Sequence, residues 1–228
     1  MPCVAIKRLK NTAVPANGEV KKHDKNPPGM GRNPKQWSDV KELYAYTMGD
    51  KNASLVKDTK IKYGPTPGNR GGSMPVGTIY IPTDDTYQGG YNPGYPNGER
   101  TETGHVGLHA HELWHQVQYK TRPGGSIIVF LALGIEQGFY KNPYFCGDPI
   151  QNPGMLNTVK SLSDIGTLEG QAQFTGQWNA DVFDWLNGKN ADMNRLKKEA
   201  RIILNSGIDS PAARDIISMD TIGNNWRD

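Results

Sequence analysis

Three of the five histidines in this 228-residue chain lie within the segment HAHELWHQVQY, positions 109–119. His111, Glu112 and His115 form the pattern His-Glu-x-x-His. On a helix, residues four apart lie one above the other, so both imidazoles can reach one metal ion. Glu112 is offset from His111 by about 100° around such a helix. Its carboxylate therefore lies beside the metal, where it can take a proton from a metal-bound water, and the pattern predicts a metal site with a general base.

The neighbouring residues favour a helix over 106–120 that can present this pattern. With His111 at zero on a helical wheel, one apolar stripe falls between about 200° and 300°, opposite the metal-facing side. This stripe consists of Val106, Ala110, Leu113, Trp114 and Val117. The helix can bury the stripe and still turn both histidines and Glu112 toward a cleft. Without a metal, the histidines would be surface residues with no ligand role.

Two histidines leave a zinc site incomplete, because catalytic zinc takes three protein ligands and keeps a fourth position for water. No histidine follows His115, so the third ligand is a carboxylate or lies upstream. Glu169 is favoured because it lies 54 residues beyond His115 (169 − 115), on a predicted helix with small neighbours. The segment between them is long enough to bring that helix back to the metal. The competing carboxylates are Glu136 and, less favoured, Asp164 and Asp181.

Hydrolysis at such a metal also needs a donor that stabilises a developing oxyanion. His105 and His109 form a second pair four residues apart, away from His111 on the wheel. They are expected to bond a carboxylate or a backbone carbonyl, or to bind substrate. The residues available as oxyanion or substrate-binding donors are Tyr119, His109, Tyr140, Tyr144 and Arg122.

The segment HELWHQVQY at 111–119, followed by LEGQAQ at 168–173, resembles zincin metallopeptidases of the gluzincin type. It looks most like the metallopeptidase toxin domains of bacterial type VI secretion spikes and phage-tail-like injection systems. The resemblance covers roughly residues 76–186. It implies one zinc ion held by His111, His115 and Glu169, with Glu112 as the general base. It also implies that the strand at 76–82 forms the upper edge of the active-site cleft.

The chain departs from that family at one position. Many gluzincins carry an Asp four residues after the ligand Glu, bonded to a zinc-bound histidine, and here that residue is Gln173. A glutamine can accept the imidazole N–H, but it does not raise the basicity of the ligand as a carboxylate does.

The resemblance implies a secreted bacterial effector or toxin that hydrolyses peptide bonds in a peptide or protein substrate. An immunity protein and a secretion-spike carrier are its implied partners, and the periplasm of a target cell is its implied place of action. The N-terminus shows no apolar segment of signal-peptide length, so we expect secretion without a classical signal peptide. The alternatives are a zinc amidase acting on peptidoglycan stem peptides and a degenerate zincin that only binds a partner. The intact Glu112 argues against the last.

Composition limits the remaining classes. The net charge of +3 is spread along the chain without a basic stripe, so no nucleic acid is expected as a partner. The apolar stretch SIIVFLALGI at 126–135 is roughly half the length of a membrane span. It is therefore expected to be a buried helix or strand. Cys3 and Cys146 allow one disulfide or two free thiols. The chain is expected to be a monomer.

The predicted fold class is α+β and zincin-like, mostly helical with a small sheet edging the cleft. The 27 glycines and 16 prolines predict many loops. An extended N-terminal arm or linker is expected at 1–37, followed by one domain at 38–228. A long loop at 83–104 is expected to border the active site as a mobile lid. The other predicted elements are helices at 38–50, about 155–187 and 191–207, and a strand at 76–82.

Overall fold

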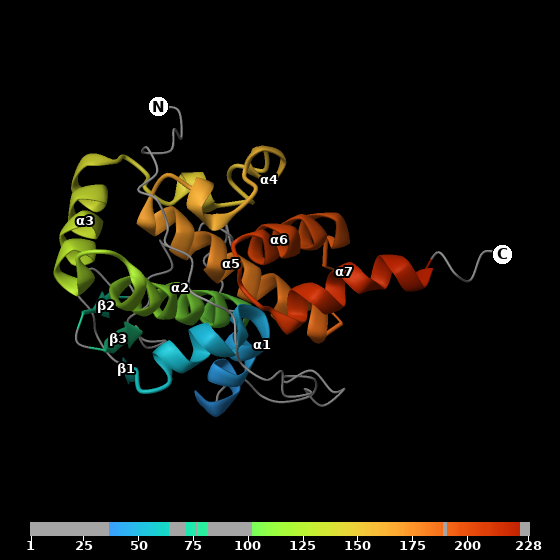
Figure 1. Ribbon diagram of the computed structural model, residues 1–228, viewed down its shortest axis with the longest axis horizontal. Coiled ribbons are helices and arrows are strands. Elements are labelled where there is room, and N and C mark those ends of the chain that lie inside the picture. Colours follow the sequence, from blue (N-terminus) through green and yellow to red (C-terminus); the bar gives the residue numbers. More distant parts are fainter. Residues whose placement is uncertain (1–36, 64–71, 76, 82–101, 189–190, 224–228) are drawn as a thin grey trace.

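The computed structural model describes residues 37–63, 72–75, 77–81, 102–188 and 191–223. This part of the chain is mostly helical and contains one small sheet, as expected of an α+β protein (Figure 1). The α-helices are α1 (Trp37–Val56), α2 (Glu102–Thr121), α3 (Gly125–Phe139), α4 (Met155–Thr158), α5 (Leu168–Leu186), α6 (Met193–Asn205) and α7 (Pro211–Gly223). The strands are β1 (Lys60–Tyr63), β2 (Gly72–Met74) and β3 (Thr78–Ile81), and the short 3-10 helices are η2 (Phe145–Gly147) and η3 (Leu162–Asp164).

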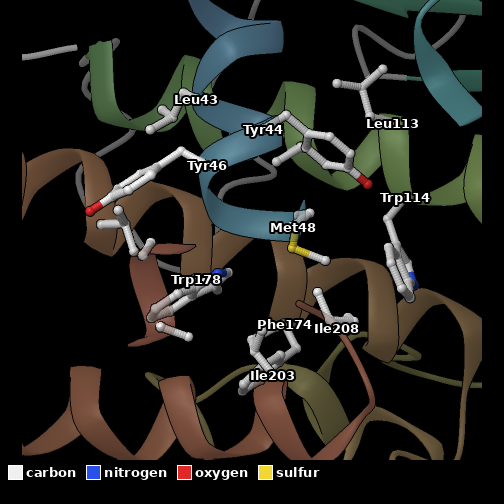
Figure 2. Close-up of a cluster of buried hydrophobic side chains, with 14 of the residues drawn as sticks. Leu43, Tyr44, Tyr46, Met48, Leu113, Trp114, Phe174, Trp178, Ile203 and Ile208 are labelled. Carbon is white, nitrogen blue, oxygen red and sulfur yellow. The ribbon is translucent and has the colours of Figure 1, made fainter. Parts of the chain in front are cut away.

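Helices α2 and α5 form the centre of the fold and make its most extensive contact with each other. α1 packs on both, while α6 and α7 pack together on the far side from the sheet (Figure 1). Figure 2 shows the core between them, where large side chains of α1, α2, α5 and α6 meet. Trp178 of α5 lies at its middle, fully buried, and its Nε1 donates to the carbonyl of Thr47 at 3.0 Å. This core fixes the two central helices relative to each other.

The sheet has the order β1-β3-β2. β3 runs parallel to β1, with Lys60 opposite Thr78, and antiparallel to β2, with Ser73 opposite Ile79. The strand predicted at 76–82 is therefore present as β3, and it is the middle strand of the sheet. Its place at the edge of an active-site cleft stays a prediction. The edge strand β2 contacts α2 directly. Gln116 of α2 donates its Nε2 hydrogen to the carbonyl of Met74 in β2 at 2.8 Å.

Several predicted helices are confirmed with shifted ends. The helix at 38–50 lies within α1, and the one at 191–207 is α6, which ends just before Gly207 at φ 74°. α2 begins at Glu102, so the predicted loop at 83–104 is shorter than expected. Residues 83–101 of that loop, and its role as a lid, lie outside the described residues, as do residues 1–36 of the arm expected at 1–37. Its last residue, Trp37, begins α1.

Two predictions about the C-terminal half were wrong or incomplete. The single helix expected at about 155–187 is divided into α4, η3 and α5. α5 begins at Leu168 because the Thr167 side chain caps it, accepting a hydrogen bond from the Gly170 backbone N–H at 2.9 Å. Helix α7 was not predicted. Cys146, in η2, is disulfide-bonded, and the other cysteine of the sequence, Cys3, lies outside the described residues.

The apolar stretch at 126–135 forms α3, but the expectation that it is buried was wrong. Within α3 only Val129 and Leu133 are buried, and they pack with Tyr119 and Leu168. The side chain of Ile127 is 73% exposed and that of Phe139 is 83% exposed. None of the helices in the described part of the chain combines the length and apolarity needed to cross a membrane.

Candidate metal centre

The two histidines of the His-Glu-x-x-His pattern face the same point from consecutive turns of α2. His111 Nε2 and His115 Nε2 are 3.2 Å apart, and the two rings meet edge to face with centroids 4.8 Å apart. The apolar stripe predicted on the opposite side of α2 is buried in the core, as expected. The histidine side of α2 is buried as well, because α5 covers it.

Helix α5 brings Glu169 to this pair from its first turn. The Oε2 atom of Glu169 is 3.3 Å from His111 Nε2 and 3.3 Å from His115 Nε2. These three residues form the only group of three or more potential ligands of this kind in the described part of the chain. The sequence-predicted ligands are thus brought together from two helices.

The three donor atoms fit a metal ion of zinc's size. A tetrahedral zinc ion with nitrogen and oxygen ligands at about 2.0–2.1 Å keeps its ligand atoms about 3.3–3.4 Å apart. The observed separations of 3.2, 3.3 and 3.3 Å match this requirement. In addition, Glu169 Oε2 is buried and accepts no hydrogen bond from the described residues. A buried carboxylate oxygen is costly unless a cation compensates it, either a protonated histidine or a bound metal ion. The arrangement could therefore hold a metal ion.

The close approach of α2 and α5 depends on two glycines. A Cβ at Gly176 would lie 2.8 Å from the Gly107 carbonyl oxygen and 3.3 Å from the Cβ of His111. A Cβ at Gly107 would lie 3.3 Å from the Gly176 carbonyl oxygen. The small neighbour of Glu169, Gly170, serves a different contact, with Gly147 of η2. Gly107 and Gly176, which sequence reasoning did not single out, are what lets the ligand-bearing helices meet.

The competing carboxylate, Glu136, has another task. Its two oxygens accept the backbone N–H groups of Leu168 at 2.8 Å and Glu169 at 3.0 Å. These donors at the start of a helix have no partner within the helix, so Glu136 caps α5 from outside. Burial raises the pKa of Glu136, while the two backbone hydrogen bonds lower it. Glu136, the alternative candidate for the third metal ligand, therefore helps to position Glu169, the favoured candidate.

The next residue of α3 continues this support. Gln137 Nε2 donates to Glu169 Oε1 at 2.7 Å. One oxygen of Glu169 is thereby fixed by an amide, and the other is left to face the histidines. The weaker candidate ligands lie elsewhere: Asp164 caps η3, and Asp181 forms an ion pair with Arg195.

Gln118 orients His115. Its Oε1 lies 2.8 Å from His115 Nδ1, and its Nε2 donates to the Leu168 carbonyl at 3.0 Å and to Gln171 Oε1 at 3.3 Å. Because the amide nitrogen serves two acceptors, the amide oxygen is the group that faces the imidazole. His115 Nδ1 then carries the proton, and Nε2 keeps its lone pair for a metal.

The residue that sequence reasoning placed in this role, Gln173, lies elsewhere. It donates to Asp148 Oδ2 at 3.4 Å. The signal for Gln118 was present in the sequence, because it follows His115 by three residues and so lies on the same side of the helix.

The charges of the metal-free site are strongly linked. Burial lowers the pKa of His115, but the adjacent Glu169 carboxylate outweighs it and the pKa rises to about 9. For Glu169, burial raises the pKa, yet His115 and His111 together hold it well below the usual range. A proton on His115 thus balances the carboxylate when no metal is bound, and metal binding would displace it.

The other predicted site residues are placed as follows. Glu112 is buried on α2 and is not a member of the three-ligand group. The hydroxyl of Tyr119 donates a hydrogen bond to the Ser73 carbonyl of β2 at 2.9 Å. His109 is buried on α2. Tyr144, which follows α3, has its ring centroid 6.0 Å from that of His111. Their roles in substrate or oxyanion binding stay predictions.

No known family model matches this chain, and no curated protein or solved structure shows significant similarity to it.

Proposed function

We propose that this chain is a zinc-dependent metallopeptidase with a gluzincin-like site. The observation that supports this most is the triangle of His111, His115 and Glu169 donor atoms, at the separations that a tetrahedral zinc ion requires. The residue beside it, Glu112, is an acid suited to proton transfer. A structural zinc site would have four protein ligands, whereas this group has three among the described residues.

A zinc ion bound here would polarise a scissile carbonyl and lower the pKa of a water molecule. The protein's own contribution to proton transfer is Glu112. Burial raises the pKa of Glu112, while His111 and His115 lower it and Glu169 raises it. A carboxylate with a raised pKa is a stronger base, so Glu112 can accept a proton from water and return it to the leaving amine.

The surrounding residues orient and restrict this chemistry. Gln118 keeps the lone pair of His115 directed at the donor triangle, and Gln137 keeps one Glu169 oxygen away from it. Tyr144, beside His111, is the residue we propose as the donor to the developing oxyanion. Tyr119 is the alternative donor, and its hydroxyl donates to the Ser73 carbonyl of β2.

The resemblance to effector domains extends this proposal to biology. A secreted bacterial toxin would cleave a protein of the target cell, with an immunity protein as its natural inhibitor. Cleavage of a peptidoglycan stem peptide is the competing activity. Incubation of the zinc-loaded chain with isolated cell-wall sacculi, beside an unfolded protein mixture, would distinguish the two substrates.

The proposal predicts different effects for the base and the ligands. Glu112→Gln should keep about one zinc per chain and lose peptide hydrolysis by about 10²–10⁴-fold or more, because the proton acceptor is gone. His111→Ala should lose zinc itself. Elemental analysis measures the metal, and mass spectrometry of new N-termini in an unfolded protein extract measures cleavage. The control is wild-type protein stripped by a chelator and reloaded with zinc. Full activity in Glu112→Gln, or stoichiometric zinc in His111→Ala, would contradict the proposal.

A further inference from the structure

Helix α3 presents a large apolar surface to solvent. Six of the ten exposed large apolar side chains in the described residues lie on this one helix: Ile127, Ile128, Phe130, Leu131, Ile135 and Phe139. If a large side chain offers roughly 150–250 Å², their exposed fractions sum to an apolar area on the order of 700 Å². This exceeds the largest patch of a typical monomer, about 300–600 Å². Such a surface marks an interaction site.

The exposure of α3 is fixed by contacts on its other side. Glu136 caps α5, Gln137 bonds Glu169, and Val129 and Leu133 pack with Tyr119 and Leu168. Turning the helix to bury its outer face would break all of these contacts at once. α3 also lies at the end of the molecule opposite α7, so a second molecule can approach it (Figure 1).

The centre of the exposed face is a stripe with two unlike halves. On a wheel of about 100° per residue, Ile127, Leu131, Gly134 and Gly138 lie within about 60° of one another. Ile127 and Leu131 project from the N-terminal half, and their side chains are 73% and 58% exposed. At Gly134 and Gly138 an added Cβ would meet nothing within 4 Å. Along the stripe, the N-terminal half therefore projects through Ile127 and Leu131, while the C-terminal half, at Gly134 and Gly138, leaves room for a side chain of another molecule.

This pattern is complementary to itself when reversed. If a second α3 lies antiparallel on the first, Ile127 of one copy faces Gly138 of the other, and Leu131 faces Gly134. Both pairings share one midpoint, since 127 + 138 and 131 + 134 each equal 265. A two-fold axis at that point satisfies every contact twice, as an isologous dimer requires. Small residues opposite large ones also let two helix backbones approach closely.

We infer that α3 is the interface of a homodimer in which two copies pack antiparallel through Ile127, Leu131, Gly134 and Gly138. The exposed apolar area of α3, on the order of 700 Å², is the most that this helix can contribute, against the roughly 800 Å² per partner of a typical stable interface. This inference does not depend on the proposed enzymatic activity. It replaces the expectation of a monomer. A helix of 15 residues is too short to span a bilayer.

The pairing can be tested by exchanging charge across it. Sedimentation equilibrium of the full chain, at about 1–100 µM, should give the mass of two chains. Leu131→Glu alone, and Gly134→Lys alone, should each weaken association roughly 100-fold or more, because each buries an uncompensated charge. Mixed together, the two variants should form a heterodimer, because only the antiparallel arrangement places Glu opposite Lys. A tag that changes the mass of one chain identifies this species. Met219→Glu, on an exposed apolar residue of α7, is the matched control and should leave the dimer intact.

Circular dichroism and zinc content should be unchanged in the variants, which separates loss of association from unfolding. A monomeric wild-type chain over the whole concentration range would overturn the inference. So would a dimer that survives both single substitutions, or a mixture that forms no heterodimer. Binding of the wild-type chain to phosphatidylcholine vesicles as a monomer, lost in Leu131→Glu, would assign the face to a lipid surface instead.

Discussion

At the scale of single residues, the candidate site depends as much on amides as on the ligands themselves. Gln118 selects the tautomer of His115, and Gln137 selects which oxygen of Glu169 faces the histidines. Neither amide side chain can ionise, so the carboxylates of the site are those of Glu169 and Glu112. A carboxylate partner would add a further negative charge against the histidines. The glutamines orient the ligands without adding that charge.

Gln118→Ala is therefore expected to weaken zinc binding by about 10–100-fold, the usual cost of losing a residue that orients a metal-bound histidine. Gln173→Ala removes an equivalent amide from a buried position that contacts Asp148 rather than a histidine. It is expected to bind zinc nearly as the wild type does. Competition titration with a chromogenic chelator measures both affinities. Equal losses in the two variants would show that Gln118 acts only through packing.

At the scale of elements, the site is the contact between α2 and α5, and two glycines set its spacing. Gly176→Ala is expected to destabilise the protein by roughly 1–3 kcal/mol, because the new methyl overlaps the Gly107 carbonyl in a tightly packed contact. The substitution should also lower zinc affinity, since it pushes Glu169 away from the histidines. Gly72→Ala, where a Cβ meets nothing within 4 Å, is the control. Urea unfolding and zinc titration give the two quantities. A Gly176→Ala protein that keeps wild-type values in both would disprove this account of the spacing.

The sequence was informative where periodicity and chemistry agree. The His111 and His115 spacing and the buried stripe of α2 followed from residue types and helical geometry. Glu169 was favoured among the carboxylates by its long connection and small neighbours, and the resemblance to gluzincins implied it. The cap made by Glu136 did not, because a carboxylate on an apolar segment is equally suited to a metal and to a helix N-terminus. Only the distance between α3 and α5 decides between these roles.

The burial of α3 could not be predicted for a related reason. An apolar run predicts that exposure of its side chains to water is unfavourable. It does not specify whether the same chain or another molecule covers the helix. The break before α5 was missed because the cap that starts this helix is a single residue, Thr167. The antiparallel match along α3 becomes visible only when the exposed side of the helix is known.

At the scale of the whole molecule, a second group of buried charges lies away from the metal centre, between α5 and α6. Arg195 pairs with Asp181 at 2.7 Å and lies 3.6 Å from the fully buried Glu199. Burial raises the pKa of Glu199 well above its usual value, and the charge of Asp181 raises it further, while Arg195 lowers it. Burial also raises the pKa of Asp181. One arginine thus faces two carboxyl groups, and the pKa of Glu199 is the more strongly raised of the two.

This arrangement predicts a stability that declines as the pH rises. Because the pKa of Glu199 is higher in the folded chain than in the unfolded one, its stabilising contribution is complete below the unfolded value, about 4.3. It is lost as the pH rises through the folded pKa, at about 1.4 kcal/mol for each unit that separates the two values. Glu199→Gln mimics the protonated carboxyl and should remove this decline.

The measurement is the difference in free energy of unfolding between Glu199→Gln and the wild type, from urea titrations in chelator at several pH values. Titration of the metal ligands is common to both proteins and cancels in the difference. The variant should gain stability relative to the wild type as the pH rises from about 5 toward 8. Asp58→Asn, the same acid-to-amide change at an exposed position, is the control and should show no comparable gain. A difference that stays flat with pH would mean that Glu199 is ionised in the folded protein and that Arg195 neutralises both carboxylates.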